Sequence, residues 1–519
     1  MIVKLFYDLM IPMVVQAGFY FPAQDISYQN QFLGAVHWSA LGVNDDSGTS
    51  DNTSALNALP TNTPIIADCP HSGFVQFTGT WNWPSGLTVW QQPGCVLEST
   101  ITTPGVYPIQ NAGGFTSATP ITNVQYYGMQ FSFVTPTSTV RVMLAWIDHL
   151  KFKYFDINGS GGFAFLRGSD QEVAFGTMEN TQTAAGNPGI RHFGNVPKVA
   201  ASPGMRANDW FHNLNFQTGD AAFQTCQPSS NPLTWGFNTS TDDLLYENSY
   251  GVSSSSAVIL INEPASDLDP SHTYTYTCTN ITYTNVSGIG HFGAIIGDSN
   301  NLTQNVTING GTIQTIGGNG GGPTQPVIGI GQFLYGGSQA SNPNTKDITL
   351  NNVGVSQFFQ TAIGVSGASN VTLINPTTSS PLVGVTSTAA TVEILGGAVN
   401  TTITGGNIAT GNNAQGIVDG LGTAATGSQI TGVSVTGVTN AKTGILLQNS
   451  VGASVTSSVV SPKSGSTTAT GIALTANPSG THGATVTGNN VSAMPVPIVC
   501  ASGQGNNVTN NTGAADCAP

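Results

Sequence analysis

Short runs of alternating apolar and polar residues recur along most of the chain, each followed by a turn of small residues and a second apolar run. Three consecutive examples are DWFHNLNFQTGDAAFQT from Asp209, DLLYENSYGVSSSSAVIL from Asp243 and NITYTNVSGIGHFGAII from Asn280. Alternation with a period of two predicts β-strands, and repetition every few tens of residues predicts a solenoid or a propeller. Because the period is irregular and the strands are short, the pattern favours an all-β, right-handed parallel β-helix, in which each coil stacks on the previous one.

The coils can be aligned on an asparagine that ends the first short strand of each. The aligned residues are Asn213, Asn248, Asn285, Asn352 and Asn375. An asparagine at the same corner of successive coils can form hydrogen bonds along the stack and satisfy turn backbone. We therefore expect these side chains to lie inside one corner of the solenoid, in a structural role.

The segment GVNDDSGTSDNTSALNALP, from Gly42, resembles the start of pectate-lyase-like and phage tailspike β-helices. The resemblance implies a short N-terminal capping helix, with Asn52 and Thr53 as its cap and residues 55–59 as its body. A cap is physically required, because an open solenoid end exposes the core and the strand edges. The acids of this segment, which we expect to be loop and cap residues, are Asp45, Asp46 and Asp51.

Composition excludes several classes of protein. Only 7% of the 519 residues are charged, and the formal net charge is −14. Disordered chains are usually highly charged, and nucleic-acid binding needs clustered Lys and Arg, so the chain fits neither class. No apolar run reaches the ~20 residues that span a bilayer. Residues 1–17 resemble a secretory signal that begins at Lys4, but Asp8 and Pro12 interrupt its apolar stretch, so a first strand or an assembly segment is an equal alternative.

The six cysteines fall into three pairs that are local in sequence. The pairs are Cys69/Cys95, Cys226/Cys278 and Cys500/Cys517. An even number of cysteines suits an oxidising compartment. We predict disulfides in the first and last pairs, near the two ends of the solenoid, where a covalent link limits fraying. Six buried thiols are the alternative.

Charged and aromatic residues concentrate on a few coils. Residues 141–298 hold 7 of the 11 Lys and Arg residues and 14 of the 25 Asp and Glu residues, and all 7 Trp residues lie at or before Trp235. Aromatic faces stack on sugar rings while polar side chains bind hydroxyls, so this region is expected to carry a glycan-binding groove. Longer solvated loops are the alternative explanation.

These features divide the chain into four regions. They are a signal-like or assembly segment at 1–35, the capped start of the β-helix at 36–130, central coils with the predicted glycan groove at 131–300, and low-charge C-terminal coils at 301–519.

Three motifs of the central coils resemble those of polygalacturonase-type glycoside hydrolases. Gly219-Asp220-Ala221 resembles their Gly-Asp-Asp, residues 187–190 (NPGI) resemble their Asn-Thr-Asp-Gly-Ile, and residues 290–293 (GHFG) resemble their Gly-His-Gly. The chain departs from the family at Ala221, at the missing Asp of the second motif, and in having no Lys or Arg from 207 to 345 for an Arg-x-Lys clamp. The resemblance therefore implies the fold and the position of the groove, but not the family's mechanism.

Asp220 follows a turn, so its carboxyl can face a groove as a catalytic acid or base; a turn-capping Asp is the alternative. Glu247 is its first expected partner, with Asp243 and Asp209 behind it. The alignment places His212 beside Glu247, for acid–base work or as a surface ion pair. The residues expected to bind substrate are Arg167, Arg191, His192, His212, Trp210 and His291. We assign no metal ligand and no cofactor; calcium at clustered acids is an unsupported alternative.

The combined features favour a polysaccharide-degrading enzyme, a glycoside hydrolase-like depolymerase that is secreted or carried on a virion. A polysaccharide lyase and a non-catalytic glycan-binding adhesin or structural β-helix are the alternatives. The expected partner is a polysaccharide, with no nucleic acid and no membrane span, and homotrimeric assembly is left open.

Overall fold

The computed structural model describes residues 32, 34–46, 48–103, 106–112, 120–135, 142–159, 162–166, 168–179, 189–192, 194–195, 199–226, 240–262, 277–297, 301–315, 326–331, 344–358, 361–379, 390–411, 413–422, 424–475, 480–500, 504–514 and 517. Arg167 and the first two residues of the 187–190 motif lie outside these ranges, as does nearly all of the 1–35 segment. Among the described residues, no helix is long and apolar enough to span a membrane.

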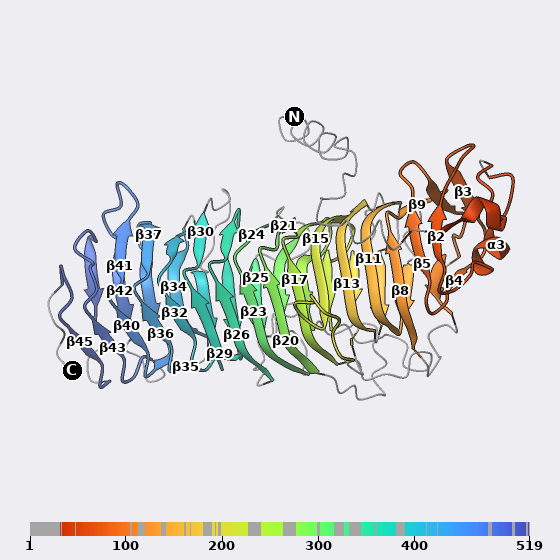
Figure 1. Ribbon diagram of the computed structural model, residues 1–519. Coiled ribbons are helices and arrows are strands. Elements are labelled where there is room, and N and C mark those ends of the chain that lie inside the picture. Colours follow the sequence, from red (N-terminus) through yellow and green to blue (C-terminus); the bar gives the residue numbers. More distant parts are fainter. Residues whose placement is uncertain are drawn as a thin grey trace.

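The described strands pair in parallel in two long sheets and one short one, and the chain winds through them as a right-handed parallel β-helix (Figure 1). The 28-stranded sheet, called sheet A, contains β1 (Val36–His37), β2 (Pro64–Ala67), β3 (Phe74–Phe77), β5 (Thr88–Gln91), β6 (Val96–Ser99), β8 (Ile121–Tyr127), β9 (Gln130–Phe133), β11 (Ile147–Asn158), β13 (Ser169–Glu179), β15 (Asp209–Thr218), β17 (Thr241–Glu247), β18 (Tyr250–Ser253), β20 (Thr277–Thr284), β21 (Ser287–Gly290), β23 (Leu302–Asn309), β24 (Thr312–Thr315), β26 (Thr345–Asn351), β27 (Gly354–Ser356), β29 (Ser369–Ile374), β30 (Thr377–Ser379), β32 (Thr402–Thr404), β33 (Asn407–Ala409), β36 (Gln429–Thr431), β37 (Ser434–Val438), β40 (Ser454–Thr456), β41 (Val459–Pro462), β43 (Thr485–Thr487) and β45 (Asn507–Thr509).

The 15-stranded sheet, called sheet B, contains β4 (Trp81–Trp83), β7 (Ile109–Asn111), β10 (Val142–Ala145), β12 (Phe163–Leu166), β14 (Ile190–His192), β16 (Phe223–Thr225), β19 (Ala257–Ile261), β22 (Phe292–Ile296), β25 (Ile328–Gly331), β28 (Ile363–Ser366), β31 (Ala390–Leu395), β34 (Gln415–Leu421), β38 (Thr443–Leu447), β42 (Thr470–Leu474) and β44 (Val496–Val499). The third sheet pairs β35 (Ala425–Thr426) with β39 (Ser450–Val451). The fold predicted from the repeat is confirmed.

The core is a stack of inward-facing side chains in register from coil to coil. One aromatic stack on sheet A consists of Phe211, Tyr246 and Tyr283, all fully buried. The rings of Phe211 and Tyr246 are 5.0 Å apart at 22°, and those of Tyr246 and Tyr283 are 4.8 Å apart at 9°. Offset stacks of this kind add to the free energy gained from burial, so the alternation of each strand both orients and stabilises its coil.

The aligned asparagines stack as predicted but on the outside of the solenoid, so their expected inward orientation was wrong. They belong to a line of turn residues in the left-handed backbone conformation, which we call the αL row. The row comprises Gly128, Tyr154, Phe175, Asn213, Asn248, Asn285, Gly310, Asn352, Asn375, Gly405, Gly432, Ser457, Gly488 and Asn510. The Nδ2 of Asn285 donates to the Oδ1 of Asn248 at 3.2 Å, and Asn375 donates to Asn352 at 3.1 Å. Asn and Gly suit this conformation, which turns the side chain away from the core.

The N-terminal end carries the expected capping helix, shifted by two residues (Figure 1). A 3-10 helix, η2 (Trp38–Leu41), precedes the single α-helix of the described residues, α3 (Thr53–Asn57), which begins two residues earlier than predicted. The Asn52 side chain makes no cap hydrogen bond and instead donates to the carbonyl of Gln76 at 2.9 Å. Asp51 accepts the Thr53 N–H at 3.0 Å, so this acid satisfies the first turn.

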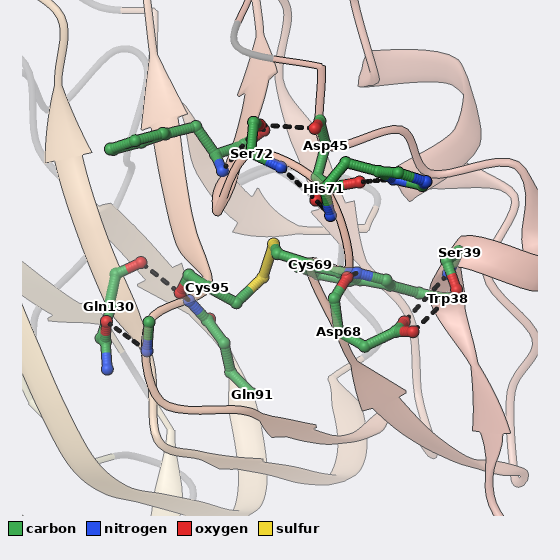
Figure 2. Close-up of a disulfide and its surroundings, with 12 residues drawn as sticks. Trp38, Ser39, Asp45, Asp68, Cys69, His71, Ser72, Gln91, Cys95 and Gln130 are labelled. Carbon is green, nitrogen blue, oxygen red and sulfur yellow. Dashed lines mark hydrogen bonds and ion pairs between the residues drawn. A yellow bond between two sulfur atoms is a disulfide. The ribbon is translucent and has the colours of Figure 1, made fainter.

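Disulfides join all three sequence-local cysteine pairs, which confirms the two predicted bonds. Figure 2 shows Cys69–Cys95 beside the loop of Asp45 and His71. The Asp45 carboxylate accepts the His71 ring N–H at 2.7 Å and the Ser72 N–H at 2.9 Å. Burial by itself raises the pKa of Asp45, but the hydrogen bonds from His71 and Ser72 outweigh it and lower the pKa to about 2. Asp45 is therefore a loop acid, as expected.

Candidate functional site

An outward-facing cluster of charged and aromatic side chains lies on sheet A beside the αL row. We call it the polar face; its members are Lys151, Lys153, Glu172, Trp210, His212 and Glu247. Strand alternation places them there, because their neighbours in sequence, such as Phe211 and Tyr246, point into the core. In the next coil the corresponding residues are Thr282 and Thr284, so the cluster ends abruptly.

Glu172 is held by two side chains of the polar face. Its Oε1 lies 2.5 Å from the Nζ of Lys153 and 3.2 Å from the Nε2 of His212. Burial by itself raises the pKa of Glu172, but the hydrogen bond from His212 and the charge of Lys153 outweigh it, and the pKa lies below its usual value. Glu172 is therefore an ionised carboxylate at neutral pH.

Glu247 lies on the opposite side of the Trp210 and His212 rings from Glu172. Its Oε2 accepts the Trp210 indole N–H at 2.8 Å, and its Oε1 accepts from the Nη1 of Arg206 at 2.6 Å. The rings of Trp210 and His212 stack with centroids 4.0 Å apart. The Arg206 side chain is 60% exposed and that of Glu247 only 5%, so the cation covers the acid from the solvent side. The two carboxylates thus flank one stacked ring pair.

A pocket of about 210 Å³ adjoins the N-terminal edge of the polar face. It is lined by side chains that include Gln125, His149, Lys151, Asp170 and Ser202. Asp170 accepts the Ser202 N–H at 2.8 Å and its hydroxyl at 2.5 Å, so the segment around Ser202 is anchored over the sheet. Hydroxyl, amide, imidazole and ammonium groups around a pocket of this size suit the hydroxyls of a sugar.

Two predicted site residues do not face a groove. Asp209 and His192 are fully buried, and the Nε2 of His192 lies 2.9 Å from the Oδ2 of Asp209. Burial raises the pKa of Asp209, although the hydrogen bond from His192 opposes the shift. The expectation that either residue contacts substrate is corrected by this placement, because Asp209 shares its inward orientation with Phe211. Their pair satisfies two polar groups inside the core.

Asp220 lies at a corner between the coil of Arg191 and the coil of Ser254 and Ser255. Its Oδ2 is 3.7 Å from the Nη2 of Arg191, and its Oδ1 accepts the Ala221 N–H at 2.8 Å. The Asp220 side chain is 18% exposed. Asp220 therefore belongs to a second group at the edge of sheet B, separate from the polar face.

The remaining predicted residues divide between the two groups and the turns. The polar face contains Trp210, His212 and Glu247. His212 pairs with Glu247 on the neighbouring strand, as the sequence alignment of the coils predicted. Asp243 is exposed at a left-handed turn and accepts the Asn208 N–H at 3.0 Å. His291 lies at a corner, its ring edge-on to Phe292 at 5.1 Å. Within the described ranges, no group of three or more His, Cys, Asp or Glu side chains is arranged to hold a metal ion.

Three members of the polar face were missed by sequence reasoning, namely Lys151, Lys153 and Glu172. The alignment relied on an asparagine in each coil, and their coils carry Tyr154 and Phe175 in the αL row instead. Counting alternation from buried Val173 would have placed Glu172 on the face that carries Trp210.

No family model and no curated protein matches the sequence. Several solved structures share the fold. A tailspike of E. coli bacteriophage HK620 is 11% identical with a TM-score of 0.44, covering 93% of this chain and 81% of its own. The family 28 exopolygalacturonase of Yersinia enterocolitica is 11% identical with a TM-score of 0.41, covering 84% and 77%. Tailspike protein 3 of bacteriophage CBA120 is 12% identical with a TM-score of 0.39, covering 94% of this chain; the chain spans 63% of that tailspike. The chain has the parallel β-helix fold of these proteins, and the similarity concerns the fold alone.

Proposed function

We propose that the protein cleaves a polysaccharide by hydrolysis at the polar face. The observation that carries this proposal is the placement of Glu172 and Glu247 on either side of the Trp210–His212 ring pair. Hydrolysis of a glycosidic bond needs one carboxylate and one carboxylic acid on opposite sides of the bond. An aromatic surface between the two acids supplies a place for a sugar ring.

Glu172 is the general base in this proposal, since His212 and Lys153 keep it ionised. Glu247 is the proton donor. Its cationic partner Arg206 is exposed on the solvent side, so a bound sugar that displaces Arg206 reaches the Glu247 carboxyl.

The two acids lie on opposite sides of β15. Glu172 on β13 is in register with Trp210 and Glu247 on β17 with His212, so their Cα atoms are two strand spacings apart across the sheet and two residues apart along it. A glycosidic bond over the ring pair therefore has one acid on each side, which hydrolysis with either inversion or retention needs.

The decisive experiment compares Glu172→Gln, Glu247→Gln and Asp220→Asn on a panel of bacterial and plant polysaccharides. New reducing ends report hydrolysis, and unsaturated uronates, read by their ultraviolet absorbance, report a lyase. We expect each Glu→Gln variant to lose about 10²- to 10⁴-fold in turnover while Asp220→Asn retains the wild-type rate. Loss confined to Asp220→Asn would move the site to the Arg191 corner, as the sequence prediction had it. Binding without product by the wild type would instead indicate a glycan-binding adhesin.

The location of the protein follows from the proposed activity. A depolymerase of this kind acts outside the cell, secreted or carried on a virion, and three disulfides suit an oxidising compartment. Homotrimeric assembly remains a prediction, which sedimentation equilibrium of the full chain tests.

A further inference from the structure

The αL row changes its residue type beside the polar face. Most of the row is Asn or Gly, which tolerate a left-handed backbone, but Tyr154 has a φ of 58° and Phe175 a φ of 55°. This conformation is disfavoured for bulky side chains. Unfavourable backbone conformations persist where the surrounding structure imposes them, and they cluster at functional sites. The two aromatic residues therefore call for an explanation that folding alone does not supply.

Their rings form a rigid surface that reaches the proposed site. The rings of Tyr154 and Phe175 stack with centroids 5.0 Å apart and an angle of 9°. Phe175 also meets the edge of the His212 ring at 5.2 Å and 80°, and His212 contacts Glu172. Phe175 is 39% exposed, whereas the aromatic residues of the core stack, Phe211, Tyr246 and Tyr283, are fully buried. It thus offers an apolar surface to a ligand while its orientation is fixed by two neighbouring rings.

The groups beyond Phe175 indicate the chemical class of that ligand. The outward side chains that follow the αL row on β13 and β15 are exposed and uncharged or acidic, namely Thr177, Glu179, Asn215 and Gln217. Hydroxyl, amide and carboxylate groups hydrogen-bond sugar hydroxyls. Neither strand carries a Lys or Arg after the αL row, and Glu179 repels anions, so this surface disfavours a uronate.

We propose that Phe175 is the stacking platform of a subsite for a neutral pyranose, next to the Glu172 side of the polar face. The polysaccharide crosses the αL row at Phe175 and continues over Thr177 and Asn215. The inference rests on the proposed function for which bond is cleaved, but glycan binding at Phe175 can be measured without cleavage.

The test is affinity electrophoresis of the full-length protein through gels that contain β-glucan, galactomannan or starch as neutral probes and alginate or polygalacturonate as acidic ones. Phe175→Asn introduces the residue that Asn213 and Asn248 supply in the same row, so it should fold with an unchanged or raised thermal midpoint. We expect this variant to bind a neutral probe about tenfold more weakly than the wild type, whereas Phe175→Trp retains binding. Val459→Asn, at a residue 45% exposed on a C-terminal coil, is the matched control and should bind as the wild type does.

The proposed platform at Phe175 is overturned if the wild type and Phe175→Asn bind a probe equally. It is also overturned if none of the probes retards the wild type. Retention by acidic probes alone overturns the neutral class of ligand. A change in sedimentation coefficient of Phe175→Asn with unaltered glycan binding would make Phe175 a contact between copies of the chain. If the wild type binds a neutral probe without releasing reducing ends, the hydrolase proposal fails, while the loss of binding in Phe175→Asn still supports the subsite.

Discussion

Glu172 and Asp148 lie on adjacent coils, and their surroundings move the pKa of the two carboxyls in opposite directions. Glu172 has cationic and imidazole partners that lower its pKa. Asp148 is only 4% exposed and accepts one backbone bond, from the Ser169 N–H at 3.1 Å. Burial raises the pKa of Asp148 to about 6, which the Ser169 N–H and His149 oppose and the charges of Asp209 and Asp170 reinforce. The pKa of each carboxyl therefore depends on the groups around it more than on whether the residue is Asp or Glu.

Asp148 makes stability depend on pH in a predictable direction. Its folded-state pKa of about 6 lies above the unfolded value of about 4, so its contribution is complete below pH ~4 and is lost as the pH rises through about 6. Asp148→Asn should therefore raise the free energy of unfolding by about 1–2 kcal/mol above that window, allowing for solvent screening, and have little effect below it. Urea unfolding at several pH values measures this. Glu172→Gln is the opposite control, expected to destabilise at neutral pH; a pH-independent effect of Asp148→Asn would contradict the assignment.

At the scale of the element, the left-handed turns of the αL row set the register between coils. Asn285 combines two contributions there, a backbone conformation that Asn tolerates and a side-chain hydrogen bond to Asn248. Gly310 occupies the row in the next coil with a φ of 67° and no side chain. The backbone conformation is therefore the first requirement on a residue of the αL row, and the side-chain hydrogen bond between coils is the second.

Substitution of Asn285 separates the two contributions. Asn285→Ala should lower the free energy of unfolding by about 1 kcal/mol, because Ala disfavours the left-handed conformation. Asn285→Gly removes the same hydrogen bond but keeps the conformation accessible, so it should cost less. Thermal unfolding of both variants measures the difference. Equal losses would show that the side-chain stack, and not the backbone, decides the residue.

The repeat made the fold predictable because each strand alternates and each turn recurs, whereas the direction of the turn side chains did not follow from recurrence. The αL conformation that points Asn248 outward is a property of backbone angles, which a repeat does not reveal. Strand alternation and register also made part of the candidate site predictable. Trp210, His212 and Glu247 share a face by register, but Asp209 was assigned by its charge although its alternation with Phe211 places it inside.

At the scale of the molecule, the chain separates a charged region, the polar face, from coils with few charged residues. The polar face occupies four adjacent coils, from β11 to β17, and the next three coils carry only Thr or Asn at the same outward positions. Each coil of a solenoid contacts only its neighbours, so stability is nearly a sum of local terms. A disturbance at one end should therefore leave the polar face intact.

Removal of the N-terminal disulfide tests this independence. The Cys69–Cys95 bond closes a loop with a sequence separation of 26 and lies beside the Asp45–His71 loop of the capped end (Figure 2). The Cys69→Ser, Cys95→Ser double variant should lose about 3 kcal/mol of local stability, seen as faster amide hydrogen exchange over residues 36–99, while exchange over residues 209–247 stays unchanged. The Cys500→Ser, Cys517→Ser variant is the control and should accelerate exchange only at the C-terminal coils. Uniformly faster exchange along the chain in either variant would show that the solenoid unfolds as one cooperative unit, in which case the cap would support the site as well as the end of the helix.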